Sequence, residues 1–343
     1  MEIWTSNITD PPINITRPLQ NNIETVYLTI STTLNAAGFI FNSIVMAYII
    51  RNRYTQNAVN YLVGNLILSN ILNSFQWSCG NIYVAIVQQA GWSFALMNII
   101  CKFSIYFWLV CYTASVGTLT LLSIERYRAI IHPLNPRLHG RKLIIILVIL
   151  WLFAIIISLP VLYSVAANEI LKYDCIVNIS QSIFHLVHTI FLNFIDYILP
   201  VCVMIYCYTK AIIKLRKTSV QALRNKKLSA GERRKKRVVK MSIILTVCFI
   251  ISALPWIFGF NAALFIDNSS NGSRQDPDNG DSSHTLLQLF PLLFLLSLFY
   301  DPIFYILSNR HISVSNDESS KSTSRTRIKL PVKMAFIRNN STA

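Results

Sequence analysis

The chain has 343 residues, of which 53% are hydrophobic and only 13% are charged, against about 25% charged residues in a typical soluble domain. This composition excludes an ordinary soluble domain and makes lipid the natural surroundings of the apolar segments. The net charge of +16 would suit a nucleic-acid-binding protein, but its distribution along the chain belongs to a membrane topology, and we expect no nucleic acid as a partner.

Seven apolar runs are each long enough to cross a bilayer as a helix, which takes roughly 20 residues. They are too long and too uniformly apolar for barrel strands, and only helices or closed barrels satisfy the backbone inside lipid. The sequence therefore predicts an all-α integral membrane bundle of seven transmembrane helices. In chain order, these predicted helices span residues 26–50, 58–87, 99–131, 143–164, 183–213, 238–266 and 286–307.

The N-terminal segment is polar and holds no short apolar core with a cleavage site, so we expect no cleaved signal peptide. With the N-terminus outside, 27 of the 31 basic residues lie on the inner side, a strong positive-inside bias. The predicted organisation is an extracellular segment 1–25, a seven-helix domain 26–309 and a cytoplasmic tail 310–343. The four basic residues left outside are Arg17, Lys102, Lys172 and Arg274.

N-glycosylation triplets support the same orientation, because five of them fall on the predicted outside. Such short triplets also recur by chance, and Asn340 matches on the inner side. The predicted glycosylation sites are Asn7, Asn14, Asn178, Asn268 and Asn271.

Two of the seven cysteines face an oxidising compartment. Cys101 lies at the outer end of the third predicted helix and Cys175 lies in the second outer loop, so we expect a disulfide that pins this loop over the bundle. The other five lie within apolar helices as small buried side chains. His185 and His188 have i, i+3 spacing, but two histidines make a poor zinc site, and we predict packing or solvent exposure for them.

The inner segments are basic. The third inner loop, 214–240, contains five consecutive basic residues at 233–237, which indicate either lipid head-group contact or a partner surface, and the two roles are compatible. Serines and threonines between 319 and 326 in the tail suit either phosphorylation that recruits kinases and an arrestin, or a disordered tail.

Short motifs follow one another along the predicted helices. Any one is weak, but their order and spacing together make coincidence improbable. They are Gly38 with Asn42-Ser43, Asn65-Leu66 with Asn70, Trp92-Ser93-Phe94 with Cys101, Glu125-Arg126-Tyr127 with Pro133-Leu134, Trp151 with Pro160, Pro200 with Tyr208, Phe249 with Pro255, and Asp301-Pro302 with Tyr305.

From residue 26 to about 312 these motifs resemble the rhodopsin-like (class A) G-protein-coupled receptors. The resemblance implies a plasma-membrane receptor that passes an extracellular signal to a heterotrimeric G protein, with no cofactor and no enzymatic activity. It assigns G-protein coupling and activation to Glu125, Arg126, Tyr127, Pro133, Leu134, Tyr208 and Tyr305. It assigns the core switch to Asn42, Asn70, Ser115, Phe249, Pro255, Ser297, Asp301 and Pro302.

The chain departs from the family at two inner positions. Asn70 stands where the family has a sodium-binding aspartate, while Asp301 stands where asparagine is usual, so the core carboxylate has moved across the bundle. We hypothesise that Asp301 is either protonated or the new charge centre, which puts sodium binding in doubt. Ala253 replaces the tryptophan that normally rests under the ligand, so Phe249 and Trp256 either carry that switch or it is lost.

The outer half of the bundle limits the ligand class. Trp108 replaces the aspartate of amine receptors, and Leu295 replaces the lysine that binds retinal. Asp196 is either a counter-ion for a cationic ligand group or a hydrogen-bonded structural acid, and each aromatic could equally be bundle packing. With the acidic exterior, the pattern favours a peptide with a basic group. The predicted ligand-binding residues are Gln76, Trp108, Tyr112, Asp196, Trp256 and Gln288.

Three other classes of protein fit the sequence less well than a receptor does. A transporter would need repeats or interrupted half-helices, and seven spans resist division into two equal halves. An enzyme would need a nucleophile–base or metal motif, and neither G-x-S-x-G nor H-E-x-x-H occurs. A receptor-like decoy that binds a ligand with weak or no G-protein coupling is the stronger alternative, given Asn70 and Ala253.

Overall fold

The computed structural model describes residues 16–51, 58–90, 94–134, 140–167, 175–177, 183–224, 236–254 and 295–307. Its labelled elements are α1 (Thr16–Arg51), α2 (Ala58–Ala90), α3 (Phe94–Ile131), α4 (Arg141–Ser158), α5 (Val161–Ser164), β1 (Val165–Ala167), β2 (Cys175–Val177), α6 (Ile183–Asn193), η1 (Phe194–Ile198) and α7 (Leu199–Arg224). Two further helices span Lys236–Leu254 and Ser297–Leu307.

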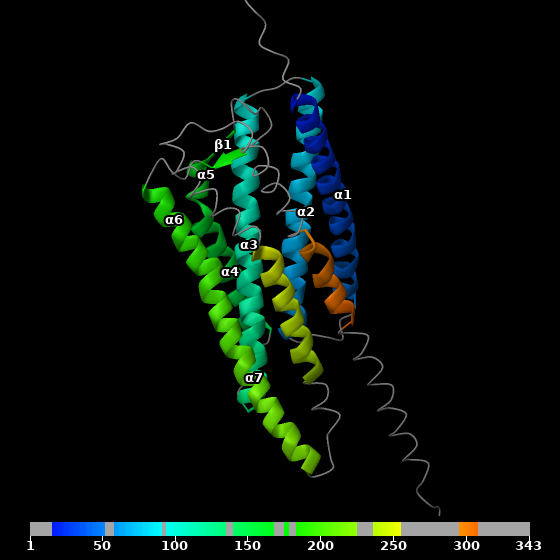
Figure 1. Ribbon diagram of the computed structural model, residues 1–343. Helices are drawn as coiled ribbons and strands as arrows, with labels where there is room; N and C mark the ends of the chain where they lie inside the picture. Colours follow the sequence, from blue (N-terminus) through cyan, green and yellow to red (C-terminus); the bar gives the residue numbers. More distant parts are fainter. Residues whose placement is uncertain are drawn as a thin grey trace, which may run out of the picture.

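The long helices run side by side as a bundle, with α3 in the middle (Figure 1). In its most apolar stretch, 67% of α3 is buried inside the protein, against 22% for α1, for α4 with α5, and for α6 with α7. The outward faces of these other helices are apolar: α4, for example, exposes Ile145, Ile149 and Ile156. A large exposed apolar surface of this kind is suited to contact with lipid.

The described residues contain five helices long and apolar enough to cross a membrane, and Ser297–Leu307 forms a shorter apolar helix. Although α2 is 33 residues long, it is not one of the five. Its sequence carries asparagines and other polar residues that lower its hydropathy, and these side chains are buried in the bundle. They include Asn65, Asn70, Asn73, Ser74, Gln76 and Asn81.

Several helices extend beyond their apolar runs. The first helix begins at Thr16 within the predicted extracellular segment, the third begins at Phe94, and α7 continues to Arg224. Hydropathy predicts only the stretch that contacts lipid or core, whereas backbone hydrogen bonding continues into polar residues. The predicted segments 255–266 and 286–294 lie outside the described residues.

The fourth predicted helix is interrupted. It ends at Ser158, turns at Leu159 and Pro160, and restarts as α5. The interruption has a plain cause, because Pro160 has no backbone N–H with which to continue the ladder. The imidazole Nε2 of His188 on α6 lies 3.0 Å from the carbonyl oxygen of Ile157 and can satisfy this group beside the break. His188 therefore links α6 to α4.

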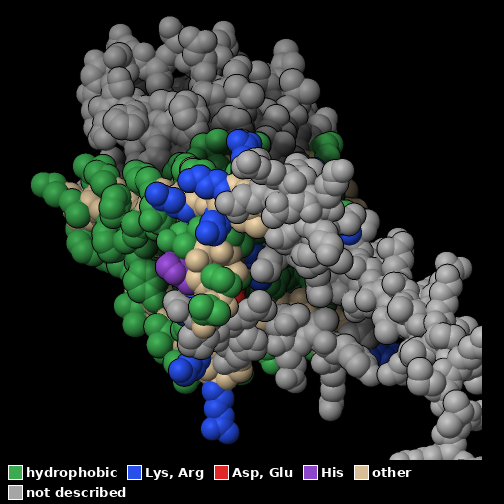
Figure 2. Space-filling model, turned by 90° about the horizontal axis from the view of Figure 1, so that it is seen from below, with side chains coloured by type: hydrophobic (Ala, Val, Ile, Leu, Met, Phe, Trp, Pro, Cys, Tyr) green, Lys and Arg blue, Asp and Glu red, His purple; other side chains and the backbone are tan. Residues whose placement is uncertain are grey.

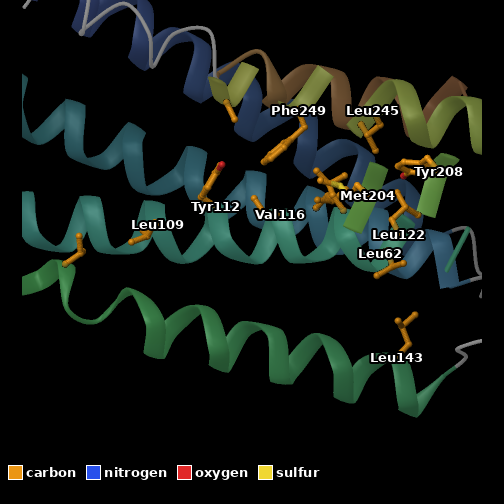
Figure 3. Packing of buried hydrophobic residues seen from close by; sticks show 14 of the residues in the cluster. Leu62, Leu109, Tyr112, Val116, Leu122, Leu143, Met204, Tyr208, Leu245 and Phe249 are labelled. Atoms are coloured by element: carbon orange, nitrogen blue, oxygen red, sulfur yellow. The ribbon is translucent and has the colours of Figure 1, made fainter. Parts of the chain in front are cut away.

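The main apolar core follows α3 and joins it to α2, α4, α7 and the helix Lys236–Leu254. Figure 3 shows the labelled members of this cluster, including Leu109, Val116 and Leu122 along α3. Two glycines allow close helix contacts. A Cβ on Gly117 would lie 2.3 Å from Leu150 Cδ1 on α4, and a Cβ on Gly38 would lie 3.1 Å from Leu298 Cβ.

The short strands β1 and β2 pair antiparallel, with Val165 opposite Val177 and Ala167 opposite Cys175. They lie at the outer end of α3, close to the outer end of α4 (Figure 1). Cys101 on α3 is fully buried and disulfide-bonded, while Cys79, Cys111, Cys202, Cys207 and Cys248 are free. The pairing of Cys101 with Cys175 stays a prediction, and a strand that brings the Cys175 backbone toward α3 supports it.

Candidate functional site

The predicted coupling triplet forms the inner end of α3. Glu125 is buried, and its Oε2 atom has no hydrogen-bond partner, whereas Arg126 and Tyr127 are half-buried. The ring of Tyr127 packs against Tyr206 on α7, with centroids 6.0 Å apart. The triplet is therefore held by the bundle on one side and reaches the inner surface on the other.

Tyr208 and Tyr305 lie in different parts of the core. The Tyr208 hydroxyl is 3.2 Å from Thr246 Oγ1 and 3.5 Å from the carbonyl oxygen of Ser242, both on the helix Lys236–Leu254. Tyr305 instead packs with residues of α1 and α2, among them Val45 and Ile67. The two tyrosines, which the family resemblance brings together only in the active state, thus occupy separate clusters here.

The inner surface combines an exposed apolar residue with positive charge. Pro133 and Leu134 follow the end of α3, and 97% of Leu134 is exposed. Figure 2 looks onto this end and shows Lys and Arg side chains gathered among apolar ones. The exposed basic residues at the inner ends of the described helices are Arg51, Arg141, Lys142, Lys214, Arg216, Lys217, Arg237 and Lys240.

The two exchanged core residues meet in space. Asn70 Nδ2 donates a hydrogen bond to Asp301 Oδ2 at 2.9 Å, and both side chains are buried. Asp301 Oδ1 has no hydrogen-bond partner. Compared with the family pattern, the amide and the carboxylate have therefore exchanged positions, and the two groups are in contact. Whether a sodium ion binds beside this pair stays a prediction.

The other predicted switch residues that the structure describes come from four helices. Asn42 Nδ2 donates to the carbonyl oxygens of Gly38 at 2.8 Å and Leu298 at 2.7 Å, which ties α1 to the helix Ser297–Leu307. Ser115, Ser297 and Pro302 are buried. Phe249 is buried beside the core of α3, and Pro255 lies outside the described residues.

A polar link between α2, α3 and α4 was incompletely predicted. The Trp151 indole N–H donates to Asn65 Oδ1 at 2.9 Å, and Asn65 Nδ2 donates to Thr118 Oγ1 at 2.8 Å. Trp151 and Asn65 belong to the motifs shared with the receptor family, but Thr118 does not. Its signal in the sequence was weak, because threonines are common within apolar helices and usually bond their own backbone, as Thr118 also does at the Ala114 carbonyl.

An aromatic line descends through the outer half of the bundle. The rings of Trp108 and Tyr112 stack at 5.5 Å, and Tyr112 stacks on Phe249 at 5.9 Å. Gln76 is buried on α2, and its Oε1 atom has no hydrogen-bond partner. The remaining predicted ligand residues, Trp256 and Gln288, lie outside the described residues.

Asp196 enters the core through a local change in helix geometry. It lies in the π-helical segment η1, and such segments change the face to which the following side chains point. Its Oδ2 atom accepts a hydrogen bond from Thr113 Oγ1 at 2.9 Å, and the side chain is buried. Thr113, which bonds Asp196, directly follows Tyr112 of the aromatic line on α3. Asp196 is therefore placed close to this line, but the Thr113 bond also suits a structural acid.

A contact between the last two described helices was not predicted. Ser252 Oγ donates to the carbonyl oxygen of Phe249 at 3.0 Å and lies 2.9 Å from the hydroxyl of Tyr300. The only signal in the sequence was Ala253, which directly follows Ser252 and departs from the family. Among the described residues, no group of His, Cys, Asp and Glu side chains could hold a metal ion. The five predicted glycosylation sites lie outside the described residues.

Comparisons with known proteins place this arrangement in a family. The model of the "7 transmembrane receptor (rhodopsin family)" matches residues 41–305. The fold is similar to that of squid rhodopsin, with a TM-score of 0.67 and 17% identity over 87% of this chain and 86% of that one. This similarity confirms the predicted all-helical seven-helix bundle.

Several peptide receptors are similar in sequence. Neuropeptide Y receptor type 1 of Xenopus laevis is 26% identical over 318 residues, which cover 87% of this chain and 83% of the receptor. Substance-P receptor of Homo sapiens is 26% identical over 66% of this chain, but the match spans only 55% of that receptor. Neuropeptide FF receptor 2 of Rattus norvegicus is 26% identical over 74% of this chain and 66% of the receptor. The chain therefore belongs to the rhodopsin family of seven-transmembrane receptors, which are multi-pass membrane proteins and not enzymes.

Proposed function

We propose that this receptor recognises an extracellular peptide with a basic group and activates a heterotrimeric G protein at the inner face of the plasma membrane. The observation that carries the coupling half of the proposal is the inner end of α3. There Arg126 lies beside a buried Glu125 and near an apolar residue, Leu134, that is 97% exposed. An apolar residue surrounded by positive charge is suited to a protein partner with an apolar groove and acidic rim.

The coupling step follows from how Tyr208 is held. Its hydroxyl lies against Thr246 and the Ser242 carbonyl, so the helix Lys236–Leu254 closes this side of the bundle. An outward displacement of that helix would remove both contacts and release Tyr208 toward the α3 end. Arg126 would then be accessible to a partner that inserts from the cytoplasm.

The ligand half of the proposal rests on charge and aromatic surface. Asp196 is a buried acid next to the stacked rings of Trp108 and Tyr112, a combination that favours a cationic group through charge and ring faces together. The acidic outer segments would attract a basic ligand before it binds. The peptide receptors among the similar proteins support a peptide as the ligand.

The decisive experiment measures signalling with Arg126→Ala. Membranes containing the receptor would be mixed with purified G-protein heterotrimers, and binding of a non-hydrolysable GTP analogue would be followed with and without a library of basic peptides. We expect Arg126→Ala to lose both basal and peptide-stimulated exchange at unchanged receptor density. The matched control is Arg128→Ala, which removes another half-buried arginine from the same helix end and should retain exchange.

One observation favours a second candidate, a receptor-like decoy. Ala253 is 1% exposed, so the core position that usually holds tryptophan is closed by a small side chain. A decoy would bind basic peptides with wild-type affinity in both arginine variants. It would show the same GTP-analogue binding as receptor-free membranes throughout.

A further inference from the structure

Two hydroxyl groups meet between the helices that carry Ser252 and Tyr300. Ser252 Oγ lies 2.9 Å from the Tyr300 hydroxyl oxygen, and either hydroxyl can donate in this contact. Ser252 Oγ also donates to the Phe249 carbonyl oxygen at 3.0 Å. We call this pair the hydroxyl clasp. It joins the helix Lys236–Leu254 to the helix Ser297–Leu307.

The clasp lies where a hydrogen bond has few substitutes. Ser252 is 7% exposed, Tyr300 is half-buried, and both belong to helices that lie within the membrane. Inside hydrocarbon, a hydroxyl that loses its partner finds no water to replace it. The ring of Tyr300 is further positioned by an edge contact with Phe304, with centroids 6.5 Å apart.

On the outer side, the clasp is attached to the aromatic line. Phe249 and Ser252 are three residues apart on one helix, so they share a face and move together when the helix turns. Phe249 stacks on Tyr112, which stacks on Trp108. A ligand that displaces these rings therefore acts on the same helix face that carries Ser252.

On the inner side, the clasp is attached to the core carboxylate. Tyr300 directly precedes Asp301, whose Oδ2 atom accepts the hydrogen bond from Asn70. Because Tyr300 and Asp301 are adjacent in the chain, a displacement of Tyr300 also moves Asp301 relative to Asn70. A chain of contacting residues therefore connects Trp108 in the outer half of α3 to Asn70 on α2. Ala253 is next to Ser252 in this chain, so the connection needs no tryptophan at residue 253.

We propose that Ser252 and Tyr300 are positioning residues that hold the helix Lys236–Leu254 in its resting place and relay displacement of the aromatic line to Asp301. This inference rests on the proposed coupling to a G protein. In the resting arrangement the clasp is closed, Leu245 and Phe249 are buried in the core, and Tyr208 is held by Thr246. Opening the clasp removes one of the bonds that oppose displacement of the helix.

The experiment compares Tyr300→Phe, Ser252→Ala and the double variant. Tyr300→Phe removes only the tyrosine hydroxyl of the clasp, whereas Ser252→Ala removes the serine hydroxyl together with its bond to the Phe249 carbonyl oxygen. Basal binding of the GTP analogue would be measured per folded receptor, with the folded fraction taken from thermal unfolding of the purified protein. Interhelical hydrogen bonds in membranes contribute about 0.6 kcal/mol on average, so each single variant should raise basal exchange about threefold. The double variant should show no further rise, because both substitutions remove the same bond.

The matched control is Tyr106→Phe. It removes another tyrosine hydroxyl that bonds between helices, at 3.3 Å from the Ile155 carbonyl oxygen, but outside the clasp. Its basal exchange per folded receptor should equal that of the wild type. Unchanged or lower basal exchange in Tyr300→Phe and Ser252→Ala, or additive effects in the double variant, would overturn the inference. If Arg126→Ala leaves exchange unchanged as well, the proposed function itself fails, which separates the two results.

Discussion

At the scale of single residues, the exchange between Asn70 and Asp301 shows how a buried charge can move without losing its partner. A buried carboxylate needs a donor, and the amide of Asn70 supplies one at 2.9 Å from the opposite helix. The pair depends on contact between one amide and one carboxylate. It does not depend on which helix carries which group.

This pair can be tested by reciprocal substitution. Asn70→Asp should destabilise the receptor by about 1–3 kcal/mol, because it removes the donor and places two carboxyl groups together. Adding Asp301→Asn should recover most of that loss, since an amide again faces a carboxylate. The measurement is the Tm of the purified receptor, with Ser69→Ala as a control on α2 whose hydroxyl bonds only its own helix. A double variant no more stable than Asn70→Asp would contradict this account.

The same substitutions test how the position of the carboxylate affects sodium dependence. If relocation of the carboxylate weakens sodium binding, the reciprocal double variant, which returns the acid to α2, should show a larger sodium-dependent fall in basal GTP-analogue binding than the wild type. The measurement is a titration with sodium against potassium at constant ionic strength. A strong sodium effect in the wild type that Asn70→Ala alone abolishes would argue against the relocated charge.

Residue roles were predictable where a motif placed them, and less so elsewhere. The sequence identified Asn70, Asp301 and Trp151 through its resemblance to the family, and the structure brings the first two into contact. It did not identify Thr113 as the partner of Asp196 or Tyr300 as the partner of Ser252. Hydroxyl side chains occur throughout these apolar helices, so which of them meet depends on helix rotation, which hydropathy does not encode.

At the scale of helices, α1 and Ser297–Leu307 approach closely at Gly38, where an added Cβ would require Leu298 to shift. A Cβ there would lie 2.9 Å from Leu298 Cδ1 and 3.1 Å from Leu298 Cβ, while Asn42 ties the same two helices through the Leu298 carbonyl. The side-chain tip can rotate away, but the Leu298 Cβ can move only with its backbone. Gly38 is therefore a packing requirement.

Gly38→Ala should cost about 1–3 kcal/mol of stability because the helices must separate. Gly64→Ala is the matched control, since a Cβ at Gly64 meets nothing within 4 Å. The measurement is the Tm of both purified variants. Equal Tm values for the two variants would show that the contact yields without cost.

Hydropathy predicted where helices lie but not where they end or break. The apolar run 143–164 gave no sign that α4 stops at Ser158, although Pro160 was visible in it. Proline inside a membrane helix is compatible with either a kink or an interruption. The outcome depends on how the carbonyl groups beside the proline are satisfied: the Leu159 N–H donates to the Ile156 carbonyl oxygen, and His188 Nε2 lies 3.0 Å from the Ile157 carbonyl oxygen.

At the scale of the whole molecule, the charge distribution sets the orientation. With 27 of 31 basic residues on the inner side, the receptor should carry glycans only on its outer segments. Glycosidase treatment of receptor from mammalian cells should lower its apparent mass, and replacing Asn7 and Asn14 by Gln should reduce that shift. Asn340→Gln, which alters a triplet on the inner side, should not. A shift that depends on Asn340 would reverse the orientation.

The polarity of α2 has a consequence for how the receptor is made. A helix that enters a membrane alone is selected by its own hydropathy, and α2 lies below the level at which the other long helices qualify. Three of its buried asparagines bond to neighbouring helices: Asn81 to Ser31 on α1, Asn65 to Thr118 and Trp151, and Asn70 to Asp301. Stable insertion of α2 therefore follows assembly with its partners, so biogenesis of this receptor is cooperative from its second helix onward.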